Sequence, residues 1–451
     1  MLTSDVPTRK WILGPISAFL GVVTEYYDLT LILGITPILS KVFLPSNISP
    51  VLAAAAIVAG FGLSYFTRPI GSLIFGHYAD RVGRRTMMIV SMVLMAVVTS
   101  AVAALPSYAQ AGYLGYICFM IIRGFVGIAF GGDYTAGFSF AVEWSPKKWR
   151  GMMGGLAMGG CGTGGLIATL ATGLLLAYWG NDAMAAYGWR YVFLSALIPF
   201  VAVLIARLAI TETPLFQYLK SAGKLEKSPL RTLVSKGTRP RFFQCLMFTI
   251  GLSGSTALAV SYFGPMLVNA PSVLTIAQQL NALQLLYLGY IVGAVLIGGH
   301  LSTIVGRRRL LLVGMVLYAI ALLPLLFAII RFASVANLVA VYSLAFVLGV
   351  LVEYSYGVAP AYLNERFGTG HRASGQGLAY SIGHMVSGTL VLLFPLLHSA
   401  FLSIELSSFW FTASVTGIIF AVIGAVAVYL GPETAKLDLD KIETKMEVSS
   451  S

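Results

Sequence analysis

Charge is scarce in this chain of 451 residues: 10% are Asp, Glu, Lys or Arg, while 58% are hydrophobic. Soluble globular domains carry about 25% charged and about 45–50% apolar residues, so a cytosolic enzyme is a poor fit. Cysteine and histidine are also rare, with three and five residues and no metal-ligand or disulfide spacing. The mean hydropathy of +0.86 instead indicates an integral membrane protein.

Apolar runs long enough to cross a bilayer, about 20 residues each, recur twelve times along the chain. Gly, Pro or clusters of charge separate them, and every run has the length of a helix. We therefore predict an all-α integral membrane protein with twelve transmembrane helices. The predicted spans are 11–39, 51–77, 86–105, 112–142, 151–178, 189–211, 242–268, 279–302, 310–330, 336–364, 374–398 and 408–430.

The basic residues predict the orientation of these spans. If the N-terminus lies in the cytoplasm, most of the 29 Lys and Arg fall in cytoplasmic segments, and only Lys41, Arg190 and Arg331 face outside. Cytoplasmic loops of membrane proteins carry such an excess. We expect a multi-pass protein of the plasma membrane with both termini cytoplasmic. The net charge of +12 then reflects topology, and we expect no nucleic-acid partner.

Loop sequences repeat at a spacing of nearly half the chain. GHYADRVGRR (Gly76–Arg85) follows the second predicted span and GHLSTIVGRR (Gly299–Arg308) follows the eighth. Similar pairs follow the fourth and tenth spans and the sixth and twelfth. We therefore predict two parallel six-helix repeats around a central cavity. The predicted parts are an N-terminal half (1–216), a cytoplasmic connecting loop (217–241) and a C-terminal half with a short tail (242–451).

Parallel repeats of this kind suit transport by alternating access. The chain resembles the major facilitator superfamily in the Gly76–Arg85 loop, in Arg123-Gly124 and in the Glu143–Arg150 segment. It is most similar to metabolite:proton symporters, through Glu25-Tyr26-Tyr27-Asp28, Arg68-Pro69-Ile70-Gly71 and Glu212-Thr213-Pro214. The resemblance runs from about Gly14 to Glu433. Two positions depart from it, since Thr303 replaces the Asp of the first loop and Asp133 stands where Glu is usual.

Ionisable side chains deep in predicted spans are costly and favour a functional role. They are Glu25, Asp28, Arg68, Arg123, Asp133, Glu353 and His384. Arg207 lies near a span end, where its side chain can reach water. Four carboxylates thus face two arginines, and a carboxylate buried without a partner can take a proton. We predict that Asp28, Glu25, Asp133 or Glu353 couples transport to protons, with Asp28 or Glu25 near Arg123, and Arg68 near Asp133.

Side chains with hydrogen-bonding groups inside the spans are candidates to bind substrate. These are Arg123, Arg68, Tyr27, Tyr262, Tyr354 and His384. The alternative is that the charged residues form static ion pairs and the tyrosines pack in the core. In the resembled superfamily, charged loops close the cytoplasmic side. This resemblance implies a cytoplasmic gate of Gly76, Asp80, Arg81, Gly83, Arg84, Arg85, Glu143, Arg150, Arg307, Glu365 and Arg372.

We therefore predict a secondary active transporter that carries a small organic acid or zwitterionic metabolite with a proton. Its partners would be the solute, protons and the lipid bilayer; we expect no cofactor, no metal and function as a monomer. Two alternatives stay open: a proton-independent carrier or exporter of a neutral solute such as a sugar, and a non-transporting membrane sensor. An enzyme is disfavoured because no nucleophile–base or metal cluster is evident.

Overall fold

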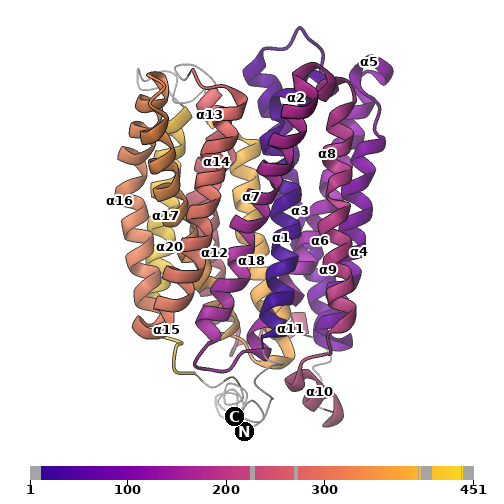
Figure 1. The fold of residues 1–451 in the computed structure, drawn as a ribbon. Helices are drawn as coiled ribbons and strands as arrows, with labels where there is room; N and C mark the ends of the chain where they lie inside the picture. Colours follow the sequence, from indigo (N-terminus) through magenta and orange to yellow (C-terminus); the bar gives the residue numbers. More distant parts are fainter. Residues whose placement is uncertain are drawn as a thin grey trace.

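The computed structural model describes residues 12–223, 229–268, 273–394, 396–397, 409–437 and 439. Residues 1–11, 224–228 of the predicted connecting loop, and parts of the last two predicted spans and of the tail lie outside this description. The described residues form a bundle of long helices and contain no strand (Figure 1). The predicted all-α fold is therefore confirmed.

Within the described residues, ten continuous helical stretches are long and apolar enough to cross a membrane. One of them, Arg150–Ala209, is 60 residues long and leaves helical geometry at Gly180, where φ is +71°. Glycine tolerates this conformation, and the chain on its two sides provides two spans. The helix over Arg372–Leu392 also runs through the bundle (Figure 1) but is rich in polar residues. This accounts for the twelve predicted spans.

The spans have these bounds in the structure: α1 (Leu13–Gly34), α3 (Pro50–Val82), α4 (Arg84–Ala101), α6 (Leu114–Trp144), α7 (Arg150–Ala183), α8 (Trp189–Ser195) with α9 (Leu197–Ala209), α12 (Arg239–Ser261), α14 (Ile276–Ile291) with the π-helix η3 (Val292–Leu301) and α15 (Ser302–Val305), α16 (Arg307–Ser334), α17 (Leu338–Asn364), α18 (Arg372–Leu392) and α20 (Phe409–Leu430). Short helices connect them: α2 (Thr36–Phe43), η1 (Val102–Ala104), α5 (Tyr108–Ala111), η2 (Met184–Gly188), α10 (Pro214–Ser221), α11 (Pro229–Leu233), α13 (Phe263–Val268) and η4 (Thr369–His371).

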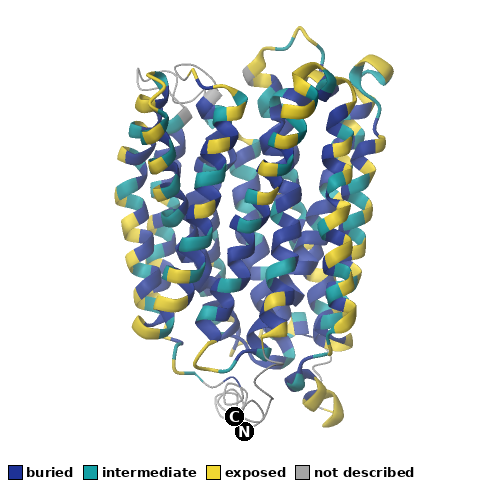
Figure 2. Ribbon diagram, in the orientation of Figure 1, coloured by how far each residue is buried: buried dark blue, intermediate teal, exposed yellow. Residues whose placement is uncertain are grey.

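The perimeter of the bundle is apolar and its interior is closely packed. Figure 2 shows exposed residues on the outward faces of the helices and buried residues between them. Large apolar side chains such as Leu174, Ile198 and Val339 are 73%, 76% and 78% exposed on this perimeter. Water would disfavour so much exposed apolar surface, whereas lipid tails accept it. The burial pattern therefore fits a bilayer.

Helices from the two predicted halves pack directly on one another. α3 lies against α18, and α7 lies against α14 and η3. A Cβ atom on Gly155 would collide with the Ala294 carbonyl and the Gly299 Cα, so only glycine permits the approach of α7 to η3. Long helices from both halves thus meet along a central seam.

The charged loops gather at one end of the bundle, where α10, α11 and α15 lie (Figure 1). We call this the basic end, and the end that carries α2, α5 and α13 the opposite end.

Candidate functional site

Asp28 and Arg123 form a fully buried ion pair between α1 and α6. Asp28 Oδ2 lies 2.7 Å from Arg123 Nη1, and the Thr99 hydroxyl donates a 2.9 Å hydrogen bond to Oδ1. Arg123 Nε donates to Ser64 Oγ at 3.0 Å. The predicted approach of Asp28 to Arg123 is confirmed. The two charges compensate each other deep in the bundle.

Arg68 pairs with Glu25 and not with Asp133, so the predicted Arg68–Asp133 pair is wrong. Asp133 instead binds Arg207, whose Nη2 lies 3.0 Å from Oδ2. Arg207 is fully buried, so the expectation that its side chain reaches water is wrong. Counting the helical rise gives the depth of a residue but not the helix face on which it lies, and the faces decide these partners.

Glu353 on α17 differs from the other three deep carboxylates. It is 1% exposed, its Oε1 has no hydrogen-bond partner, and no ion pair of the described residues includes it. Four deep carboxylates are therefore matched by three buried arginines, whereas the prediction counted only two arginines. The carboxylate left without a cation is Glu353.

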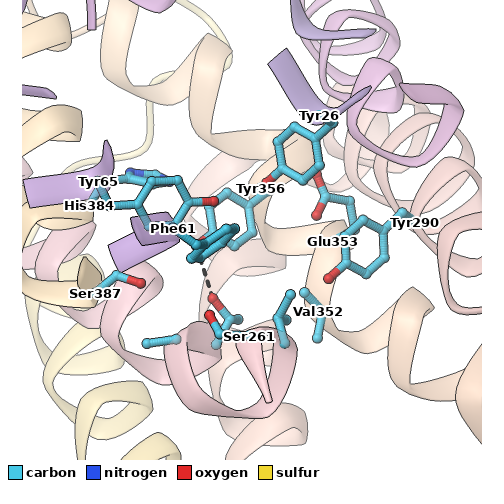
Figure 3. Close-up of a pocket in the computed structure, with 13 residues that line it drawn as sticks. Tyr26, Phe61, Tyr65, Ser261, Tyr290, Val352, Glu353, Tyr356, His384 and Ser387 are labelled. Atoms are coloured by element: carbon cyan, nitrogen blue, oxygen red, sulfur yellow. Dashed lines mark hydrogen bonds between the residues drawn. The ribbon is translucent and has the colours of Figure 1, made fainter. Parts of the chain in front are cut away.

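Glu353 lines a small pocket between helices of the two predicted halves (Figure 3). The centre of a water molecule can occupy about 20 Å³ of this pocket, which is enough space for about one water. Figure 3 shows the Glu353 carboxylate between Tyr26 and Tyr290. The lining residues are Tyr26, Phe61, Tyr65, Thr256, Ala257, Val260, Ser261, Tyr290, Val352, Glu353, Tyr356, His384 and Ser387. We call this the central pocket.

Hydroxyl groups and one histidine provide most of the polarity of the central pocket. Tyr290 is buried and its hydroxyl has no partner, while the Tyr356 hydroxyl lies 3.0 Å from Thr256 Oγ1. His384 Nδ1 lies 3.2 Å from Ser253 Oγ and 3.1 Å from the Tyr380 carbonyl. Neither lysine nor arginine is among the described lining residues. The pocket can therefore accept and donate hydrogen bonds at several points without a fixed positive charge.

Most of the predicted substrate-binding residues lie outside the central pocket. The Tyr27 hydroxyl lies 2.7 Å from Ser195 Oγ, the Tyr262 hydroxyl donates to the Val391 carbonyl at 3.2 Å, and the Tyr354 side chain packs near Gly314. Arg68 and Arg123 are held by their carboxylates and do not line the pocket either. Of the predicted substrate-binding residues, only His384 lines the central pocket.

The tyrosines that do line the pocket were not among the predicted site residues. Their signal in the sequence is helical spacing, since Tyr356 follows Glu353 by three positions and Tyr65 follows Phe61 by four, which puts each pair on one face. The ring of Tyr65 also connects the pocket to the neighbouring Glu25–Arg68 pair. The Arg68 guanidinium lies 4.2 Å from the centre of that ring.

Two carboxylates join the predicted halves at the basic end. Glu143 Oε1 lies 3.3 Å from Arg84 Nη2 and 3.0 Å from Nη1 of Arg372, which belongs to the other half. In the same way, Glu365 Oε1 lies 3.2 Å from Nη2 of Arg307 and 3.2 Å from Nη1 of Arg150 across the seam. Each carboxylate thus binds one arginine from each side.

Asp80 adds a third connection, this one to the start of α18. Its Oδ2 accepts hydrogen bonds from Ser374 N at 3.0 Å and from Ser374 Oγ at 2.7 Å. An anion at a helix N-terminus is favoured by the unpaired N–H groups there. Gly76 packs against Ser374, where an added Cβ would lie 3.2 Å from its Cα. With these contacts, the basic end is closed.

Arg81 and Arg85 do not take part in this closure, in contrast to the prediction. Arg81 is exposed, with Nη1 3.2 Å from His77 Nε2. Arg85 donates from its backbone N to Glu212 at 3.0 Å and from Nη2 to the Leu208 carbonyl at 2.7 Å. Gly83, with φ of +129°, turns the chain toward Glu212. The partners of these residues all belong to the same predicted half, so the contacts organise the loop within that half.

A histidine at the basic end is held neutral by its surroundings. Burial, together with the charges of Arg372 and Arg241, lowers the pKa of His371 to about 4. Its Nε2 is buried and has no hydrogen-bond partner. His371 therefore adds no positive charge to this arginine-rich region near neutral pH.

Comparison with known proteins places this chain among transporters. Residues 18–285 match the family model described as Major Facilitator Superfamily, and residues 221–446 match Sugar (and other) transporter. The proline/betaine transporter of Escherichia coli (strain K12) is 28% identical, over 82% of this chain and 75% of that protein. The shikimate transporter of the same organism is 24% identical, over 83% of this chain and 84% of that protein.

A solved structure gives the same answer for the fold. The proton:xylose symporter XylE, bound to 6-bromo-6-deoxy-D-glucose, superposes with a TM-score of 0.78 at 20% identity, over 98% of this chain and 100% of that one. The first family model covers more than half of this chain. The predicted family is therefore confirmed: the chain belongs to the major facilitator superfamily and is a multi-pass membrane transporter, not an enzyme.

Proposed function

We propose that this transporter moves a small organic acid or zwitterionic metabolite together with a proton, by alternating access across the plasma membrane with the basic end in the cytoplasm. The observation that carries the proposal is Glu353, a carboxylate buried in the central pocket without a cation. The similarity to transporters named for shikimate and for proline and betaine supports the substrate class.

Among the four predicted proton carriers, Glu353 fits the role best. A buried carboxylate that faces no cation is stabilised by binding a proton, whereas Asp28, Glu25 and Asp133 each face an arginine that stabilises the charged form. Glu353 also lies between the predicted halves, where water can reach it alternately from the two ends as the halves rock.

The same carboxylate couples the proton to the solute. In the described conformation the central pocket has room for about one water, so the solute enters it when the halves move and widen it. When Glu353 is charged, it then repels a substrate carboxylate. When it is protonated, it donates a hydrogen bond to that carboxylate, and the hydroxyls of Tyr290 and Tyr26 lie beside it (Figure 3). Proton binding thus precedes substrate binding, and both leave together once the basic end opens.

Uptake into proteoliposomes under an imposed inward proton gradient tests this proposal. A panel of organic acids, amino acids and betaines identifies the solute. Glu353→Gln is expected to abolish accumulation against a gradient and to retain solute exchange, because the amide is neutral like a protonated carboxylate. The matched control is Glu212→Gln, in the loop at the basic end. Full accumulation by the Glu353→Gln variant would refute Glu353 as the proton carrier.

A carrier of neutral solutes is the second candidate. The central pocket has hydroxyl and aromatic side chains, and among its described lining residues no lysine or arginine. Once the movement of the halves has widened the pocket, such a lining also suits a polyhydroxylated ring. Adding xylose to the same uptake panel separates the two, since a neutral-solute carrier would exchange xylose and ignore carboxylates.

A further inference from the structure

A much larger cavity opens at the opposite end of the bundle, between helices of the two predicted halves. Its volume is about 1030 Å³. It lies between α1, α2, α3 and α5 on one side and α13 and α14 on the other. Because the basic end is closed by Glu143, Glu365 and Asp80, this cavity provides the open approach to the seam.

Two polar side chains in this cavity have chemistry that complements a substrate. Lys41 on α2 is exposed and is the only charged residue among the described lining. Gln279 on α14 is 1% exposed, lines the same cavity, and its Oε1 has no hydrogen-bond partner. A buried carbonyl oxygen without a donor is energetically unfavourable, so Gln279 gains by meeting a donor from a ligand.

We propose that this cavity is an outer recognition site that binds the solute before it reaches the central pocket. Lys41 binds the carboxylate of the solute, and Gln279 Oε1 accepts a hydrogen bond from a hydroxyl or ammonium group of the same molecule. The inference rests on the proposed function and narrows its substrate class. It selects hydroxy acids and amino acids over fully methylated betaines, which have a carboxylate but no N–H or O–H donor.

Binding to the full-length chain in nanodiscs tests the donor requirement with matched probes. L-proline is compared with N,N-dimethylproline, and shikimate with cyclohexene-1-carboxylate, which lacks the three hydroxyls. In each pair the carboxylate is kept and the donors are removed. The wild-type chain is expected to bind L-proline or shikimate more tightly than its donor-free counterpart. If none of the four probes binds, or if each pair binds equally, the proposal is wrong.

Variants then assign the contacts. Lys41→Gln is expected to weaken binding and to raise KM about tenfold at unchanged kcat, the factor that loss of one charged hydrogen bond typically gives. Lys41→Arg restores binding, and Arg331→Gln, an exposed cation at the same end, has no effect. Gln279→Met removes the preference for probes with donors. A fall in kcat for Lys41→Gln, or unchanged affinity in both variants, would contradict the assignment.

The Glu353→Gln variant separates this inference from the proposed function. It is expected to bind L-proline or shikimate in the outer cavity although proton-driven accumulation is lost. If Glu353→Gln is uncoupled while Lys41→Gln binds and transports normally, only the outer site fails. If Lys41→Gln weakens binding while Glu353→Gln accumulates solute normally, only the proton assignment fails.

Discussion

Asp28 and Glu353 are both buried carboxylates, but only Asp28 faces an arginine. Asp28 Oδ2 lies 2.7 Å from Arg123, whereas Glu353 Oε1 has no partner. Removing the charge of Asp28 leaves a buried guanidinium uncompensated, and removing the charge of Glu353 leaves no cation behind. The two substitutions therefore have different consequences.

Asp28→Asn is expected to destabilise the protein by about 3–5 kcal/mol, the usual cost of breaking a buried ion pair from one side. Glu353→Gln, the matched control, is expected to leave stability nearly unchanged. Thermal unfolding of the purified variants in detergent measures both. Equal stability of Asp28→Asn and wild type would show that the Asp28–Arg123 pair is not a structural element.

At this scale the sequence predicts which side chains are deep and that carboxylates outnumber their arginines. It does not predict the partners, because one residue along a helix turns the side chain by about 100°. Tyr26 lines the central pocket and Tyr27 binds Ser195. Likewise Arg207 lies near the end of its span but bends back to Asp133. Rotation of the helices about their axes, set by packing, decides these contacts.

At the scale of elements, Glu143 and Glu365 connect helices across the seam. Each accepts from one arginine of its own predicted half and one of the other, at 3.0–3.3 Å. Opening of the basic end must break the Glu143–Arg372 and Glu365–Arg150 contacts while the contacts within each half remain.

Glu143→Gln or Glu365→Gln is expected to open the basic end. Alkylation of Ser139→Cys, placed at a fully buried position on α6, reports this opening in a chain whose native cysteines are replaced by serine. The labelling rate is expected to rise about tenfold, the factor for loss of one charged hydrogen bond. Glu212→Gln, which affects contacts within one loop, should not change the rate. Unchanged labelling in both gate variants would contradict the gate.

His371 predicts a dependence of stability on pH. The pKa of His371 is about 4 in the folded protein and about 6.5 in an unfolded chain. The unfolded state therefore binds the proton at a higher pH than the folded state does. The free energy of unfolding consequently decreases as pH falls from about 6.5 toward 4. His371→Gln is expected to flatten this part of the profile of Tm against pH. An identical profile in the variant would contradict the assignment to His371.

The sequence predicts the elements well where hydrophobic length decides them and less well at their ends. α3 continues to Val82, beyond the predicted end at 77, since the helix extends past the apolar region. This polar last turn carries Asp80, which contacts Ser374. The first predicted span breaks after Gly34, ahead of Pro37 in α2. Short reorientations of this kind leave the hydropathy of a segment unchanged, so the apolar pattern does not reveal them.

At the scale of the molecule, the duplicated loops predict equivalent contacts, and the structure contains them. Glu212 accepts from Arg85 N at 3.0 Å, and Glu433 accepts from the equivalent Arg308 N at 3.1 Å. The boundaries of the two halves stay a prediction. Within the part of the chain that the structure describes, the deep ion pairs, by contrast, are not duplicated. All three lie in the predicted N-terminal half and tie α1, α3, α6 and α9 together, while Glu353 on α17 has no cation among the described residues.

This asymmetry leads to one central claim, that a proton on Glu353 accompanies the solute through the molecule. The most direct measurement is proton flux in proteoliposomes that contain a pH-sensitive dye, after external addition of the transported solute in the absence of an imposed pH gradient. For the wild-type chain we predict that solute entry acidifies the lumen, and that Glu353→Gln shows solute exchange without acidification. Solute entry into wild-type liposomes with no change in lumenal pH would contradict the account.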